Sequence, residues 1–217
     1  ILPLLVKTSI PTIIGMLVMV IYNLTDTFFV GILNNKSMTA AIGIVFSFMS
    51  FIQAIGFWFG YGSGNIMSKR IGQGNEYEAE KISSIGILFA LGFGILIAFI
   101  SWIFISPLAR FIGGSASESL MRFTVDYMRV IVLSIPFALY SMTLYNQLRL
   151  CGNVKDGMRG LLSGMLVNMA LDPILMFGLG LGFIGAGYAT LIGQIVGTIL
   201  LTRLSRKNGN IGVDLKK

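Results

Sequence analysis

The stretch Val167-Asn168-Met169-Ala170-Leu171-Asp172-Pro173-Ile174 places an amide, a carboxylate and a proline in the middle of an apolar segment. Asn168 and Asp172 are four residues apart, so on a helix they lie one turn apart on the same face. Pro173 has no N–H, which leaves the carbonyl of Met169 without its helical partner and predicts a kink here. Because an ionised group is costly in hydrocarbon, we interpret Asp172 as part of a buried site. The alternative is a hydrated turn at the membrane surface.

The composition is that of an integral membrane protein. Hydrophobic residues make up 55% of the chain, charged residues 12%, and the mean hydropathy is +0.83; a soluble domain carries roughly 25% charged residues. There is no histidine, so proton chemistry near neutral pH would depend on carboxylates. The single cysteine, Cys151, excludes an intrachain disulfide. The net charge of +7 is better explained by loops that face an anionic cytoplasmic surface than by binding of nucleic acid.

Six apolar stretches are each long enough to cross a bilayer as a helix. They lie at 10–33, 40–68, 82–105, 123–150, 157–178 and 185–205. A break rich in Ser, Pro and Gly at 106–115 separates the third stretch from the fourth, and Pro136 predicts a kink within the fourth. The predicted fold is therefore all-α, a six-transmembrane-helix bundle over residues 1–205, followed by a basic tail at 206–217.

The distribution of Lys and Arg predicts the orientation, because six spans put both chain ends on one side of the membrane. The face without the termini holds only Lys36, Arg110, Arg122 and Arg129. The face with the termini holds Lys7, Lys69, Arg70, Lys81, Arg149, Lys155, Arg159, Arg203, Arg206, Lys207, Lys216 and Lys217. This asymmetry predicts a multi-pass protein of the cell membrane with both termini in the cytoplasm.

Glycines recur at a four-residue spacing within the predicted helices. The three sets are Gly56/Gly60/Gly64, Gly160/Gly164 and Gly193/Gly197. Small residues at this spacing let helix backbones approach closely when lipid supplies no hydrophobic drive. We expect them to serve helix packing; the alternative is a moving hinge.

Only two acids, Asp26 and Asp172, are predicted to lie deep within spans. Tyr22 lies one turn before Asp26, Thr190 supplies a hydroxyl in the sixth stretch, and Gln194 lies one turn further on. Together with the side-chain amide of Asn168, these side chains offer oxygen ligands and no nitrogen or sulfur ligand. Such a set suits a proton or a hard cation such as Na⁺ rather than a transition metal.

Over essentially its whole length the chain resembles the N-terminal half of a multidrug and toxic compound extrusion (MATE) transporter. The matching motifs are Pro11 with Tyr22-x-x-x-Asp26-Thr27-Phe28-Phe29-Val30-Gly31, Ser68-Lys69-Arg70-Ile71-Gly72-Gln73-Gly74, Gln147-Leu148-Arg149-x-x-Gly152-Asn153, Asn168-x-x-x-Asp172-Pro173 and Gly185-Ala186-Gly187-Tyr188-Ala189-Thr190. Their order and spacing, more than any single motif, carry the resemblance.

The resemblance implies two six-helix lobes around a central cavity, with export of organic cations driven by inward movement of H⁺ or Na⁺. It implies an ion or proton site at Asp26, Asn168 and Asp172, where Na⁺ can bind, with Tyr22 and Thr190 as supporting oxygens. No catalytic residue and no cofactor beyond the coupling ion are expected.

The resemblance also implies a substrate cavity, and we expect Asn23, Met165 and Gln194 to line it. Family members have twelve spans, so we interpret this chain as one lobe and its basic tail as the linker between lobes. The expected partners are the lipid bilayer, a C-terminal six-helix lobe of the same transporter and small organic cations.

The leading function is therefore a cation-coupled antiporter of drugs and toxins, not an enzyme. A lipid-linked oligosaccharide flippase of the same superfamily is the alternative, but it would line its cavity with cations, and no Lys or Arg is predicted deep in a span. An intramembrane aspartyl protease is a further alternative, but Asp172 lacks the typical Gly-x-Gly-Asp motif. A passive structural membrane module would give no reason for an acid beside Pro173.

Overall fold

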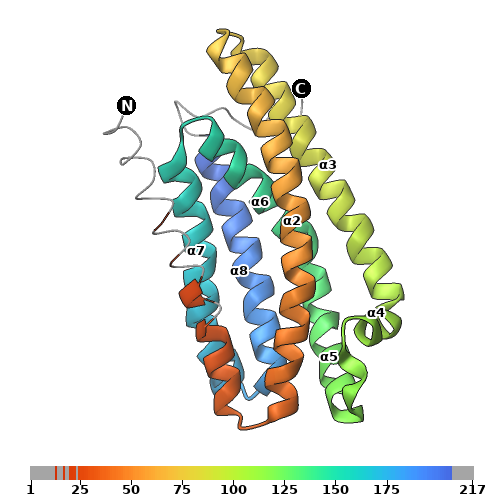
Figure 1. Ribbon diagram of the computed structural model, residues 1–217. Helices are drawn as coiled ribbons and strands as arrows, with labels where there is room; N and C mark the ends of the chain where they lie inside the picture. Colours follow the sequence, from red (N-terminus) through yellow and green to blue (C-terminus); the bar gives the residue numbers. More distant parts are fainter. Residues whose placement is uncertain (1–12, 14–16, 18–19, 23, 207–217) are drawn as a thin grey trace.

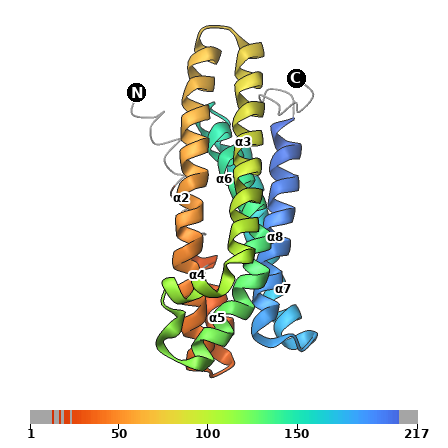
Figure 2. The same ribbon diagram turned by 90° about the vertical axis from the view of Figure 1, so that its right-hand side faces the viewer.

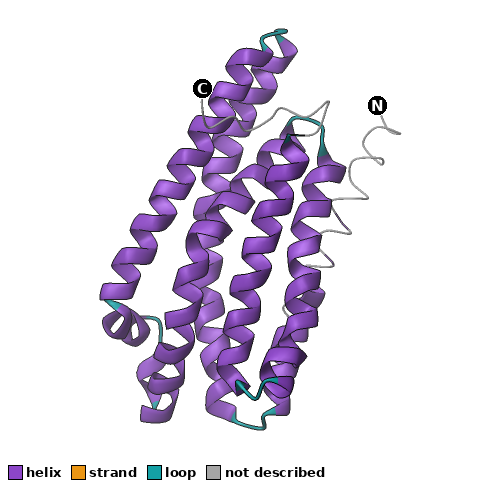
Figure 3. Cartoon of the chain, turned by 180° about the vertical axis from the view of Figure 1, so that it is seen from behind, coloured by secondary structure: helices purple, strands orange, loops and turns teal. Residues whose placement is uncertain are grey.

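The chain folds into a bundle of long helices (Figure 1); the computed structural model describes residues 13, 17, 20–22 and 24–206. The elements are a helix at Val20–Ile32, α2 (Lys36–Gly72), α3 (Glu76–Ile103), α4 (Ile105–Phe111), η1 (Gly114–Ala116), α5 (Glu118–Ile131), η2 (Val132–Ser134), α6 (Ile135–Leu150), α7 (Val154–Pro173), η3 (Ile174–Gly178) and α8 (Gly182–Ser205). Every element in the described part is helical, as Figure 3 shows. The prediction of an all-α fold is confirmed.

Five helical stretches in the described part are long and apolar enough to cross a membrane. They are Lys36–Gly72, Glu76–Ile103, Glu118–Leu150, Val154–Gly178 and Gly182–Ser205. These stretches match the second to sixth predicted spans to within a few residues. Of the first predicted span, 10–33, the structure describes chiefly the helix Val20–Ile32. Of the predicted tail at 206–217, the structure describes only Arg206.

Both prolines that were predicted to interrupt helices coincide with a change of helix type. Pro136 is the second residue of α6. One turn of 3₁₀ helix, η2, comes directly before α6 and separates it from α5. Pro173 ends α7, and the chain continues as the wider π-helical turn η3. Since proline cannot donate a backbone hydrogen bond, the regular ladder stops at both positions.

The predicted break at 106–115 does separate the third span, which ends at Ile103, from the fourth, which begins at Glu118, but it also contains the short helix α4, which was not predicted. Pro107 is tolerated there as the third residue of the helix, where backbone N–H groups have no helical partner in any case. Ile105 and Ala109 are buried on one face of α4, which packs against α5. Burial of this apolar face outweighs the turn signals in the sequence.

Helices α2 and α3 form a hairpin that extends beyond the other helices at the end of the bundle where α8 finishes (Figure 2). With 37 residues, α2 is about 55 Å long, whereas the hydrocarbon core of a bilayer is about 30 Å thick. The turn between the two helices contains Gly74 in a left-handed conformation, with φ 76°, and Asn75 caps α3 by accepting the N–H of Glu78. The end of the hairpin therefore projects into water.

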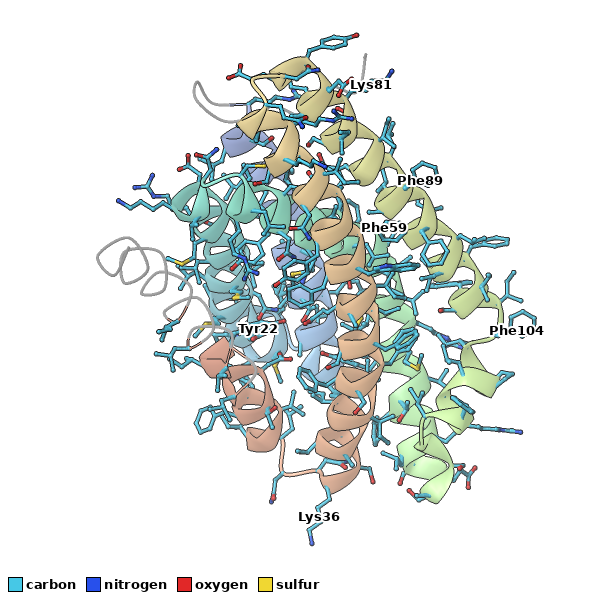
Figure 4. All side chains as sticks on the ribbon, turned by 45° about the horizontal axis from the view of Figure 1, so that its top comes forward. Tyr22, Lys36, Phe59, Lys81, Phe89 and Phe104 are labelled. Carbon is cyan, nitrogen blue, oxygen red and sulfur yellow. The ribbon has the colours of Figure 1, made fainter. Side chains whose placement is uncertain are left out.

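Large apolar side chains cover the outer face of α3. Figure 4 shows Phe89 and Phe104 directed away from the bundle, and both are more than half exposed. In a chain with this hydropathy, such a surface is suited to contact with lipid tails.

The glycine sets lie at the closest contacts between helices. A Cβ atom added to Gly60 of α2 would lie 2.7 Å from Cβ of Asn146 on α6. A Cβ atom added to Gly164 of α7 would lie 2.7 Å from the carbonyl oxygen of Gly193 on α8. The interpretation as packing residues is confirmed for every member of the sets except Gly197, whose Cβ atom would meet nothing nearer than 3.4 Å. The others define two tight helix pairs, α2–α6 and α7–α8.

We predict that Gly60→Ala destabilises the bundle, because the new methyl group overlaps Asn146 and forces α2 away from α6. The expected cost is about 1–3 kcal/mol, typical of an overpacked contact, seen as a lower midpoint of thermal unfolding in detergent. Gly62→Ala is the matched control, since its Cβ atom would meet no atom within 4 Å. Equal midpoints for the two variants would contradict the packing role.

Candidate ion site and cavity

Asn168 and Asp172 lie one turn apart on the face of α7 that packs against α8. Asn168 is 2% exposed and Asp172 is completely buried. Nδ2 of Asn168 donates a hydrogen bond to Oγ1 of Thr190 on α8, over 3.2 Å. The face of α7 that carries Asn168 and Asp172 is thus directed into the lobe.

The helix Val20–Ile32 brings two more of the predicted residues to this place. Asp26 is buried, and its carboxyl group is close enough to that of Asp172 for the two to interact electrostatically. Tyr22, labelled in Figure 4, is hydrogen-bonded to the side chain of Thr190. The structure therefore brings together all five residues that were predicted to form the ion site.

Tyr127 of α5 belongs to the same cluster, although the sequence analysis missed it. Its side chain is 3% exposed and interacts electrostatically with Asp26. A Cβ atom on Gly187 would lie 3.3 Å from the ring of Tyr127, so the glycine leaves room for it. No spacing in the sequence links this tyrosine to the acids.

A second glycine of the same motif holds the π-helical turn beside α8. A Cβ atom on Gly185 would lie 2.9 Å from the backbone of Leu175 and Met176 in η3. The turn follows directly after Asp172 and Pro173. The close approach of η3 to α8 therefore helps to place Asp172 beside Thr190.

Four oxygen atoms of the cluster have no hydrogen-bond partner among the described residues. They are Oδ1 of Asp26, Oδ1 of Asn168, and Oδ1 and Oδ2 of Asp172. The ion pairs seen in the described part, Arg70–Glu78, Arg129–Asp126 and Arg159–Asp156, involve neither buried acid. A buried carboxylate pair without a counter-charge is unfavourable, so the arrangement is suited to bind a proton or a cation.

The composition of the cluster limits which cation can bind. The described residues contain no group of three or more His, Cys, Asp or Glu side chains that could hold a metal ion. A bound cation would therefore complete its shell with the amide of Asn168 and the hydroxyl of Thr190. Neutral oxygens with one or two carboxylates suit a monovalent hard cation better than a transition metal.

A cavity of about 350 Å³ opens beside this cluster. Tyr22, Asp26, Asn168 and Thr190 line one part of it, whereas Asp172 is completely buried and is not among the lining residues. The predicted substrate residues Met165 and Gln194 line the cavity as well; the third, Asn23, lies outside the described residues.

Helices α2 and α6 supply the opposite wall of the cavity, which the sequence analysis did not identify. Its side chains include Met49, Gln53, Ser141 and Met142. Oγ of Ser141 donates a hydrogen bond to Oε1 of Gln194, over 3.4 Å. Adaptable thioethers beside neutral amides and a hydroxyl form a wall that accepts varied amphipathic molecules.

Comparison with known proteins identifies the class to which this site belongs. Residues 11–174 match the MatE family. The chain is 34% identical over 209 residues to the multidrug export protein MepA of Staphylococcus haemolyticus, covering 96% of this chain and 46% of that protein. It is 28% identical over 203 residues to MepA of Staphylococcus aureus, covering 94% and 45%. A solved MOP superfamily transporter from Pyrococcus furiosus superimposes with a TM-score of 0.88 at 28% identity, over 98% of this chain and 47% of that one.

The chain therefore belongs to the MatE family of multidrug and toxic compound extrusion transporters. It is a membrane protein of a transporter family, and its relatives are export proteins rather than enzymes. The chain spans about half the length of the relatives it matches, as one lobe of a two-lobed transporter would.

We predict that Gly193→Ala weakens export, because its Cβ atom would lie 2.7 Å from the carbonyl oxygen of Gly164 and 2.9 Å from Cβ of Asn168. These clashes would push α7 and the amide of Asn168 away from Thr190. In cells that express the full-length transporter, dye efflux should fall on the order of tenfold, equivalent to about 1.4 kcal/mol. Gly197→Ala, one turn along α8, is the control, since its nearest contact would be an ordinary 3.4 Å. Efflux that is equal in the two variants would contradict a positioning role for Gly193.

Proposed function

We propose that the transporter containing this lobe is an antiporter that exports amphipathic, often cationic, drugs and toxins in exchange for H⁺ or Na⁺. One observation carries the proposal. Four buried oxygens of Asp26, Asn168 and Asp172 have no hydrogen-bond partner among the described residues, and they lie beside a cavity large enough for a small organic molecule. The family of export proteins to which the chain belongs supports the same function.

The two acids have different access to the cavity, which suggests how exchange occurs. Asp26 lines the cavity, whereas Asp172 is not among the lining residues and interacts with Asp26 electrostatically. The positive charge of a drug would meet Asp26 and would compensate the acid pair. A proton or Na⁺ bound between Asp26, Asn168 and Asp172 would compensate the same charges, so the drug and the coupling ion compete.

The helix Val20–Ile32 is the element that can transmit this exchange to the shape of the lobe. It carries Asp26 and Tyr22, and both side chains reach the cluster on α7 and α8. Binding of the coupling ion would change the preferred position of this helix, narrow the cavity and release the drug. A ligand shifts the equilibrium between two positions of this helix only if it binds one position more tightly than the other. Here the two positions would differ in whether Asp26 and Asp172 remain close together.

The proposal includes the orientation and partners of the lobe. The excess of Lys and Arg on one face supports cytoplasmic termini in the cell membrane. The second half of the transporter, a C-terminal six-helix lobe, would cover the open side of the cavity. The end of the bundle that carries the α2–α3 hairpin and the α6–α7 connection would then face the cytoplasm.

We predict that Asp172→Asn, which imitates the neutral acid, leaves folding intact and abolishes coupling. The variant cannot bind and release the proton, and it offers one carboxylate fewer to Na⁺. The measurement is export of a radiolabelled organic cation by the full-length transporter in proteoliposomes, under an imposed pH gradient and separately under a Na⁺ gradient. The wild-type protein should respond to one of the two gradients, and the variant to neither.

Asp156→Asn is the matched control, because Asp156 lies in the first turn of the same helix and pairs with Arg159 at the surface. It should transport like the wild-type protein. Gradient-driven export by Asp172→Asn at the wild-type rate would remove Asp172 from the mechanism.

A further inference from the structure

The cavity-lining face of α6 continues toward the end of the lobe where α6 meets α7. Ser141 and Met142 line the cavity. Tyr145 follows one turn further on, and Arg149 two turns further on, so both lie on the same side of the helix. We call this row of side chains, Ser141, Tyr145 and Arg149, the α6 stripe. It begins at the cavity and ends at the positively charged guanidinium of Arg149.

The cavity-lining face of α2 ends at the same place. Gln53 lines the cavity, and Phe57 and Tyr61 follow it at four-residue spacing. The rings of Phe57 and Tyr61 are stacked, with centroids 5.9 Å apart. The guanidinium of Arg149 donates a hydrogen bond to the hydroxyl of Tyr61, which joins the ends of the two stripes.

Two aromatic rings hold the guanidinium of Arg149. Its central carbon lies 5.3 Å from the ring centroid of Tyr61 and 5.9 Å from that of Tyr145. Arg70 and Arg159, in the same half of the lobe, pair with carboxylates, but no described acid forms an ion pair with Arg149. A guanidinium has five N–H donors, so most of them remain available for a partner outside this lobe.

We propose that Arg149 forms an ion pair with a carboxylate of the second lobe, and that this pair closes the cytoplasmic end of the cavity while the cavity is open to the outside. The inference rests on the proposed function, which supplies the second lobe and the orientation. The relatives of this chain are about twice its length, and in a transporter of that length the second half would be large enough to cover the open side of the cavity.

Position and charge favour this partner over a lipid phosphate. Arg149 lies on the stripes of α2 and α6 that line the cavity, whereas the lipid-suited face described above is on α3. The two tyrosines restrict the guanidinium before the partner arrives, so less side-chain entropy is lost when the pair forms. A planar, fixed guanidinium is also the group that binds a carboxylate with two parallel hydrogen bonds.

The test measures how readily the cavity is reached from the cytoplasm. Leu161→Cys places a thiol on the α7 wall of the cavity in the full-length transporter, with its native cysteines replaced by serine. Cys151 is among them, although burial raises the pKa of its thiol to about 11 and makes it unreactive at neutral pH. Two impermeant methanethiosulfonate reagents, one cationic and one anionic, are added to separate samples of inside-out vesicles, and the labelling rates are followed. Loss of the Arg149 charge would by itself speed only the cationic reagent, so opening of the cavity must raise the rate of both.

Arg149→Gln should raise the labelling rate about fivefold, which corresponds to loss of an ion pair of roughly 1 kcal/mol. Glutamine can still bond to Tyr61, so the variant retains the local contact without the charge. Arg149→Lys keeps the charge and should stay within about twofold of the starting protein. Arg159→Gln removes a nearby charge that is off the stripe, and the rate should not change.

Three results would overturn the proposal. The first is an unchanged labelling rate in Arg149→Gln, and the second is an equal rise in Arg159→Gln. The third is a rise that occurs only in vesicles containing anionic lipid, which would assign Arg149 to a headgroup. The assay does not depend on a driving ion, so failure of the Asp172→Asn test would be recognised separately from failure of this one.

Discussion

The interaction on which the rest of this lobe depends is the repulsion between two buried acids that form no ion pair with any basic residue in the described part of the chain. Asp26 and Asp172 come from helices far apart in the sequence, yet their carboxyl groups interact inside the bundle. Keeping them together without a bound cation is unfavourable. The surrounding elements must therefore hold them by other means. They do so through packing around the hydroxyl of Thr190, to which Asn168 and Tyr22 are hydrogen-bonded.

Close backbone contacts provide the rigidity that this arrangement needs. Between helices in lipid there is little hydrophobic drive, so dispersion contacts and hydrogen bonds must hold the bundle together. Gly164 and Gly193 bring α7 and α8 together at the acids. On the other side, the amide of Gln147 bonds to Ser63 at 2.9 Å and to Ser83 at 3.0 Å, which fixes α2, α3 and α6 to one another. The cavity lies between these two rigid groups, with the first helix along its open side.

The cavity consequently has different chemistry at its two ends. The acids and the hydroxyls of Tyr22 and Thr190 lie at one end, next to the π-helical turn. Beyond Gln53 and Ser141, the same faces of α2 and α6 continue past the lining residues to Arg149 and its aromatic neighbours.

The sequence by itself determined the features that depend on local chemistry: the spans, the breaks at Pro136 and Pro173, and the shared face of Asn168 and Asp172. Helical period and the missing proline N–H act within a few residues of each other. The approach of Asp26 to that face was implied by family resemblance alone, and Tyr127, Gln53 and the helix α4 were not anticipated. Only the tertiary structure decided these, because contacts between distant residues depend on how glycine-lined helices cross, and no pattern along a single helix encodes that.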